Sequence, residues 1–283
     1  MCSSDLQPVD KLIQFYNKAS TSVITSTSNL LQDMYVNGAY KTSSCVYVGG
    51  GADANNDFMN FVRVRVHGYS HSAFFLQGYQ SHQNHFFDCD VNGIDVTQTS
   101  QNGLYGVFSQ PVVGSNAAAS FIWERGSCGW HAGSDFFMGG ANSTGCHILW
   151  ADSENTYRFF ETSSSTNISA FPIKIEGCRI ETDKVSSDGK IINCLVSGPL
   201  SIKNCQIGTG GASSTVFPKI YIENTKQMLV SVTDSVFSYS NIGTGQSSYD
   251  ASSLEVAYVS NEEMAQVTRS EEHTSELQSH HDL

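Results

Sequence analysis

The side chains of this chain that are best suited to chemistry are four acids spread over the middle of the sequence. These candidate catalytic residues are Asp88, Glu124, Asp152 and Glu154. Of two carboxyl groups at a fixed separation, one can protonate a leaving oxygen while the other activates water or attacks carbon. Arg125 lies next to Glu124, and its guanidinium can bind a ligand carboxylate through two parallel hydrogen bonds. A structural role is open to each acid as well, either at a bend or in a surface ion pair such as Glu154 with Arg179.

The elements that would position these acids follow a repeated pattern. Its order is apolar, any residue, apolar, any residue, turn residue, small residue, any residue, apolar. It occurs at 173–180, 200–207, 230–237 and 84–91, and less well at 59–66. Alternation of period two inside each unit indicates strands rather than helices. Recurrence at steps of roughly 25 to 37 residues indicates a solenoid.

Stacking these units predicts three columns of residues. The second apolar position gives an inward column, with the register at the two tryptophans uncertain by one residue: Phe61, Phe86, Trp123, Trp150, Ile175, Ile202 and Val232. Small residues give a second column: Cys89, Cys178, Cys205 and Ser235. The bend between the two strands of a unit holds the third: Asp88, Arg125, Asp152, Gly177, Asn204 and Asp234. Asp, Asn and Gly suit such a bend because they tolerate the left-handed backbone conformation. The predicted fold class is therefore all-β, a single-stranded parallel β-helix of about seven or more rungs.

These rungs, over roughly residues 45–240, resemble the right-handed parallel β-helix (pectin-lyase-like) proteins, and among them the bacteriophage tailspikes that bind or cut surface polysaccharide. The resemblance implies a right-handed helix, a homotrimer located in the virion tail, and a bacterial capsule or O-antigen as the partner. It implies the fold more strongly than the activity. A Gly-His-Gly run is absent, which argues against pectate-lyase and polygalacturonase activity.

For a glycan-cleaving protein, the expected site lies on the outer face of the rungs. Strands stack about 4.8 Å apart, so two rungs would place Asp88 and Asp152 about 9–10 Å apart, near the upper end of the range for inverting hydrolysis. Glu124 and Glu154 would lie beside them, and Arg125 would bind a sugar carboxylate. The long step between Phe86 and Trp123 predicts a loop within residues 92–120. The side chains expected to line the groove are Tyr105, Trp130, His131 and Tyr157.

Several alternatives remain open at this point. A lyase acting on an acidic sugar would depend more on His131 and Arg125 than on the acids. A non-catalytic receptor-binding or structural fibre would keep the groove without cleavage. A secreted polysaccharide lyase or adhesin would instead act outside the cell or at its surface.

Composition narrows the class of partner. The formal net charge is −12, which argues against nucleic acid and anionic membrane as partners, because both need basic patches. No run of 18 apolar residues exists, so no membrane span is expected.

The cysteines form no CxxC pair, and the histidine cluster has no spacing that demands a metal. The members of that cluster are His67, His71, His82 and His85. Neither a metal site nor a cofactor is therefore expected, and no disulfide framework is expected from the seven cysteines after Cys2.

The chain divides into five expected segments. Residues 1–6 and 269–279 resemble the in-frame translation of a short-read sequencing adapter, and together with 280–283, which follow that tail, they are expected to be artefacts. Residues 7–44 are expected to form a lead-in or cap segment, with helix in part of 9–36. Residues 45–240 form the expected β-helix, and 241–268 a last rung or linker.

Overall fold

The computed structural model describes most of the repeated region and a few segments on either side of it. Both terminal segments assigned to adapter sequence, the predicted bend residue Asp234 and parts of the expected 92–120 loop lie outside the described residues. The described ranges are 9–15, 29–49, 57–77, 80–94, 103–110, 118–139, 144–163, 172–181, 189–196, 199–209, 219–224, 230–233, 235–241, 246–249, 254–257 and 267–268.

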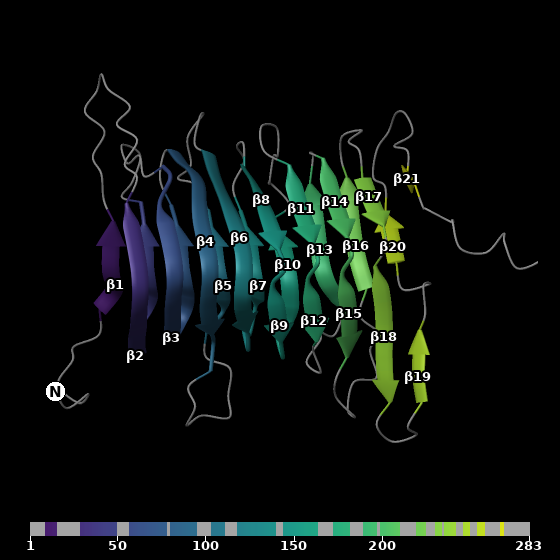
Figure 1. Ribbon diagram of the computed structural model, residues 1–283, viewed down its shortest axis with the longest axis horizontal. Coiled ribbons are helices and arrows are strands. Elements are labelled where there is room, and N and C mark those ends of the chain that lie inside the picture. The colour runs from purple at the N-terminus through teal and green to yellow at the C-terminus, as the bar shows by residue number, and fades with distance from the viewer. Residues whose placement is uncertain are drawn as a thin grey trace, which may run out of the picture.

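The described residues form strands and no helix, and the strands stack as a parallel solenoid (Figure 1). A typical turn has three short strands. In one such turn β8, β9 and β10 pair in parallel with β11, β12 and β13 of the next turn. The predicted fold class is confirmed. The solenoid has about five complete turns, slightly fewer than the seven or more expected, and the strand sets at its two ends are only partly paired.

The strands have the following bounds: β1 Val9–Phe15, β2 Leu30–Val48, β3 Asn60–Leu76, β4 Gln80–Asn92, β5 Tyr105–Ser109, β6 Ala118–Gly129, β7 Ser134–Met138, β8 Thr144–Leu149, β9 Asp152–Glu154, β10 Arg158–Thr162, β11 Ile173–Glu176, β12 Arg179–Glu181, β13 Lys190–Val196, β14 Leu200–Lys203, β15 Gln206–Thr209, β16 Lys219–Asn224, β17 Val230–Thr233, β18 Val236–Asn241, β19 Gln246–Tyr249, β20 Leu254–Ala257 and β21 Val267–Thr268. Strand β19 is antiparallel to β18, whereas the other strand pairs are parallel.

Among the residues whose burial is described, the predicted inward column is confirmed except at one level. Phe86 pairs with Phe61 on one side and with Trp123 on the other, and the rings of Phe61 and Phe86 stack with centroids 4.8 Å apart. Trp123 then pairs with Ile148, so Ile148 and not Trp150 continues the column. The prediction failed here because the large apolar side chain of Trp150 was taken as the core residue in place of Ile148, two residues before it.

The corner after the first strand of a turn begins with a residue in the left-handed region. The bend residues with positive φ are Asp33, Arg63, Asp88, Arg125, Trp150, Gly177 and Asn204. This column agrees with the predicted one at Asp88, Arg125, Gly177 and Asn204. Asp152 was wrongly assigned to it, since Trp150 occupies the bend and Asp152 lies two residues further on, in β9.

The cysteines after Cys2 lie in the solenoid interior, as expected for small buried residues. The seven cysteines after Cys2 are all buried and unbridged. Burial raises the pKa of Cys45 and of Cys89 to about 12, because the low-dielectric interior disfavours the thiolate.

We therefore expect these seven thiols to resist modification in the folded protein. In a Cys2→Ser background at pH 8, an aromatic disulfide reagent should release almost no thiolate chromophore until denaturant is added. Rapid reaction of the native protein would contradict the closed interior. The readout is the absorbance released before and after unfolding.

Two segments near the N-terminus differ from the expected description. The described parts of residues 9–36 are strands, so the helix expected there is absent from them. Strands β1 and β2 pair with each other, and β2 pairs with β3, so parallel stacking begins ahead of residue 45. Within the described ranges, no helix meets the length and apolarity needed to cross a membrane.

Candidate functional site

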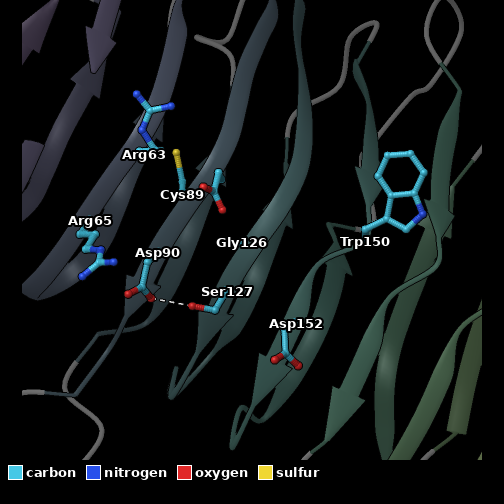
Figure 2. A pocket seen from close by; sticks show the side chains of 9 residues that line it. Arg63, Arg65, Cys89, Asp90, Gly126, Ser127, Trp150 and Asp152 are labelled. Atoms are coloured by element: carbon cyan, nitrogen blue, oxygen red, sulfur yellow. Dashed lines mark hydrogen bonds between the residues drawn. The ribbon is translucent and has the colours of Figure 1, made fainter. Parts of the chain in front are cut away.

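A shallow groove with a volume of about 420 Å³ crosses the outer face of strands β3, β4, β6 and β9 (Figure 2). Its lining comprises Arg63, Arg65, Asp88, Cys89, Asp90, Gly126, Ser127, Trp150 and Asp152. Most of these residues stand at the bend or within two residues after it. The bend of each turn therefore brings polar side chains from successive turns onto one surface.

One row of polar side chains runs across the floor of this groove. Arg65 pairs with Asp90, Asp90 with Ser127, and Ser127 with Asp152, each on the next strand in parallel register. Ser127 donates a hydrogen bond to Asp90 over 2.6 Å. Figure 2 shows these four side chains in sequence across the strands. The carboxylates aligned two strands apart are thus Asp90 and Asp152, which corrects the expected alignment of Asp88 with Asp152. Asp88 still lines the same groove.

Trp150 gives the groove an aromatic side. Its side chain is 52% exposed, whereas the sequence predicted a core position. A Cβ atom on Gly177 would lie only 2.4 Å from Cδ1 of Trp150, so the indole rests directly over this glycine. The backbone of Trp150 has a φ of 53°. A bulky residue in this region is strained by about 1–2 kcal/mol, and such strain occurs often at functional sites.

Arginines border the groove, and their partners differ. Arg63 forms two hydrogen bonds to Asp33, and these bonds lower the pKa of Asp33. Arg179 donates a hydrogen bond to Asp152 over 2.8 Å. This bond is the largest cause of the raised pKa of the Arg179 guanidinium. Within the described part of the chain, Arg65 has no hydrogen-bond or ion-pair partner. Arg65 is therefore available to an anionic or hydroxyl group of a ligand.

A second hollow of about 280 Å³ continues the groove along β4, β6 and β9. It shares Asp90, Ser127 and Asp152 with the first, and adds Trp130 and Glu154. Four of the nine site residues expected from the sequence line the two hollows. They are Asp88, Asp152, Glu154 and Trp130. Both hollows are open to solvent, as a site for a long polymer requires.

The remaining expected site residues lie elsewhere. Glu124 contacts Nε2 of His85 at 3.2 Å on the outer face before the bend. Arg125 stands at its bend with its guanidinium carbon 5.8 Å from the ring centre of Phe87. Neither residue lines the groove. Tyr157 is 38% exposed and lines neither hollow.

Tyr105 and His131 belong to two other parts of the molecule. Tyr105 packs against Phe108 and Phe137 in an aromatic cluster on the outer face formed by β5 and β7. His131 is fully buried and hydrogen-bonded to Tyr69 and Asp135. Because its side chain is buried, His131 cannot contact a polysaccharide on the outer surface in this structure.

Among the groove residues that were not predicted from the sequence are Asp90, Arg65 and Trp150. The signal that could have found Trp150 is the small residue after each bend. Ala151 occupies this position at the level of Trp150, as Cys178 does after Gly177. Aligning the rungs on the small residue would have placed Trp150 at the bend and Asp152 in line with Asp90. No family model, curated protein or solved structure matches this chain.

Proposed function

We propose that this chain binds a bacterial surface polysaccharide along the groove of β3, β4, β6 and β9 and cleaves it by hydrolysis. The observation that carries the proposal is the exposed indole of Trp150, held at a strained bend in the same groove as Asp88, Asp90 and Asp152. Sugar rings have apolar faces and polar edges. An aromatic platform beside acids and an arginine offers complementary groups to both.

The row of carboxylates suggests the reaction. Asp90 and Asp152 lie two inter-strand steps apart, roughly 9–10 Å between backbones. This separation is near the upper end of the range for inverting glycosidases, in which a water molecule fits between acid and base. In this proposal Asp152, which Arg179 holds in place over 2.8 Å, takes the role of base and Asp90 that of acid.

In this reaction, Asp152 accepts a proton from water while the water oxygen bonds to the anomeric carbon. The bond from that carbon to the leaving oxygen breaks, and Asp90 donates a proton to the leaving oxygen. The net result is addition of one water across the glycosidic bond, with inversion at the anomeric centre.

The broader biological role rests on the resemblance of the rungs to tailspikes. In this proposal the chain is the body of a phage tailspike that acts in the virion tail as a homotrimer. The parallel solenoid is compatible with this role, and the groove supplies a surface for a capsule or O-antigen chain. A non-catalytic receptor-binding fibre is the main alternative, because the same groove would also serve binding alone.

The test combines binding and cleavage on a panel of purified capsules and O-chains. Asp152→Asn and Asp90→Asn are each expected to lower the rate of reducing-end release by about 10²-fold or more, the usual contribution of a general acid or base. Glu124→Gln serves as the matched control, because Glu124 lies outside the groove. Proton NMR of the first product should show the inverted anomer.

Each outcome separates the alternatives. Release of reducing ends by wild type and loss in both groove variants support hydrolysis by this pair. Polysaccharide binding without any cleavage by wild type would favour the receptor-binding fibre. An unsaturated product would indicate a lyase. Equal rates in wild type and in both variants would remove Asp90 and Asp152 from the mechanism.

A further inference from the structure

We infer that the corner between β6 and β7 is a binding site for a transition-metal ion, with zinc as the best chemical match. The three ligands are the thiolate of Cys128, the imidazole of His131 and the carboxylate of Asp135. Their ligand atoms all lie within 4.8 Å of one another, and all three side chains are fully buried. This inference is independent of the proposed function, because the corner lies inside the solenoid.

The local chain explains how the three ligands converge. Cys128 is near the end of β6, His131 lies in the connection, and Asp135 is in β7. The spacing C-x2-H-x3-D thus brings sulfur, nitrogen and oxygen together within eight residues. Zinc accepts these three donor types in tetrahedral sites. No metal was expected from the sequence, because it contains no CxxC pair and the histidines at 67–85 have no spacing that demands a metal.

Charge balance favours a divalent ion at this position. A thiolate and a carboxylate together carry two negative charges, and a buried charge is costly unless it is paired. One divalent ion neutralises both. In the structure, Nδ1 of His131 lies 2.6 Å from Oδ1 of Asp135 as a hydrogen bond. Tetrahedral ligands at zinc are on the order of 3.3 Å apart, so a modest separation of these two side chains admits the ion.

The surrounding residues already hold the ligands in place. The hydroxyl of Tyr69 lies 2.5 Å from Nε2 of His131, which leaves Nδ1 to face Cys128 and Asp135. Ser153 donates to the other carboxylate oxygen of Asp135. Such outer contacts orient metal ligands and fix the tautomer of the histidine.

Two glycines make room for this cluster. A Cβ on Gly106 would lie 2.3 Å from Sγ of Cys128, and one on Gly93 would lie 3.0 Å from Cδ2 of His131. A larger residue at Gly106 would displace the sulfur of Cys128, and one at Gly93 would press on the backbone carbonyl of Trp130 next to His131. The turn after β4 and the start of β5 therefore leave space for the polar corner.

The full chain is tested by expression in medium supplemented with zinc and, separately, with cobalt, followed by dialysis and metal analysis. We expect one metal ion per folded chain. The cobalt protein should show a near-ultraviolet thiolate charge-transfer band and intense visible bands of tetrahedral Co²⁺. Cys128→Ser and Asp135→Asn should each lower the metal content at least tenfold, whereas Tyr69→Phe should weaken metal affinity by about 10–100-fold.

Cys146→Ser is the matched control, because Cys146 is equally buried but does not belong to the cluster. Retention of the cobalt band in Cys146→Ser and its loss in Cys128→Ser would support the site. Wild-type protein that is folded by circular dichroism, yet contains no zinc and shows no cobalt band, would overturn the inference. If Cys128→Ser does not fold, the wild-type cobalt spectrum and Tyr69→Phe still decide the question.

Discussion

Truncating Trp123 to alanine is expected to lower the free energy of unfolding by about 3–5 kcal/mol. Trp123 is fully buried, stacks on Phe86 with ring centres 5.7 Å apart, and contacts Phe136 edge to face. Removing the indole leaves a cavity between two turns, since the rigid stack cannot collapse around it. Denaturant titration followed by far-ultraviolet circular dichroism measures the loss.

Trp123→Phe is the matched control for this prediction. Among the described residues, the Nε1 atom of Trp123 has no hydrogen-bond partner and is buried, so phenylalanine removes an unsatisfied donor while it keeps most of the ring contacts. We expect Trp123→Phe to cost much less than Trp123→Ala. Similar losses for both variants would mean that the hydrogen-bonding state of Nε1, rather than the cavity, governs stability here.

The second large effect is expected at Trp150. Trp150→Asn should weaken polysaccharide binding by roughly 30-fold, which corresponds to about 2 kcal/mol, the loss typical of a tryptophan at the centre of a binding site. The fold should remain intact, because asparagine tolerates the left-handed bend, as Asn204 does in the same column. Isothermal titration with purified polysaccharide, together with denaturant titration, separates the two effects.

Tyr157→Ala provides the comparison for Trp150. Tyr157 is also an exposed aromatic residue, but it lines neither hollow of the groove. Binding should therefore change little in Tyr157→Ala. An equal loss of binding in both variants would place the ligand beyond the groove, while unchanged binding in Trp150→Asn would remove the aromatic platform from the proposal.

The sequence predicted the repeated frame well because buried positions are constrained by their neighbours. Each inward residue contacts the residue one turn before and one turn after it, as Phe86 does with Phe61 and Trp123. Only apolar residues satisfy these contacts, so the inward column leaves a regular trace in the sequence. The cysteines after the bends leave a similar trace, because little space exists there.

The sequence predicted the site less well because outward positions lack this constraint. A bend accepts residues as different as Arg63, Trp150 and Asn204. The type of residue in the sequence therefore does not indicate which position is the bend. A frame error of two residues at Trp150 was enough to pair Asp152 with the wrong acid. The corner around His131 was also beyond prediction, since its partner Tyr69 is far away in the sequence and nothing in the local pattern indicates burial.

The column of bend residues has a further consequence for how such a chain can evolve. Because the bend side chains lie outside the stack, a substitution there changes the surface at one level without repacking the interior. Neighbouring bends are about 4.8 Å apart, which is comparable to the length of one sugar unit. New ligand preferences can therefore arise one level at a time, while the apolar column continues to select for the same fold.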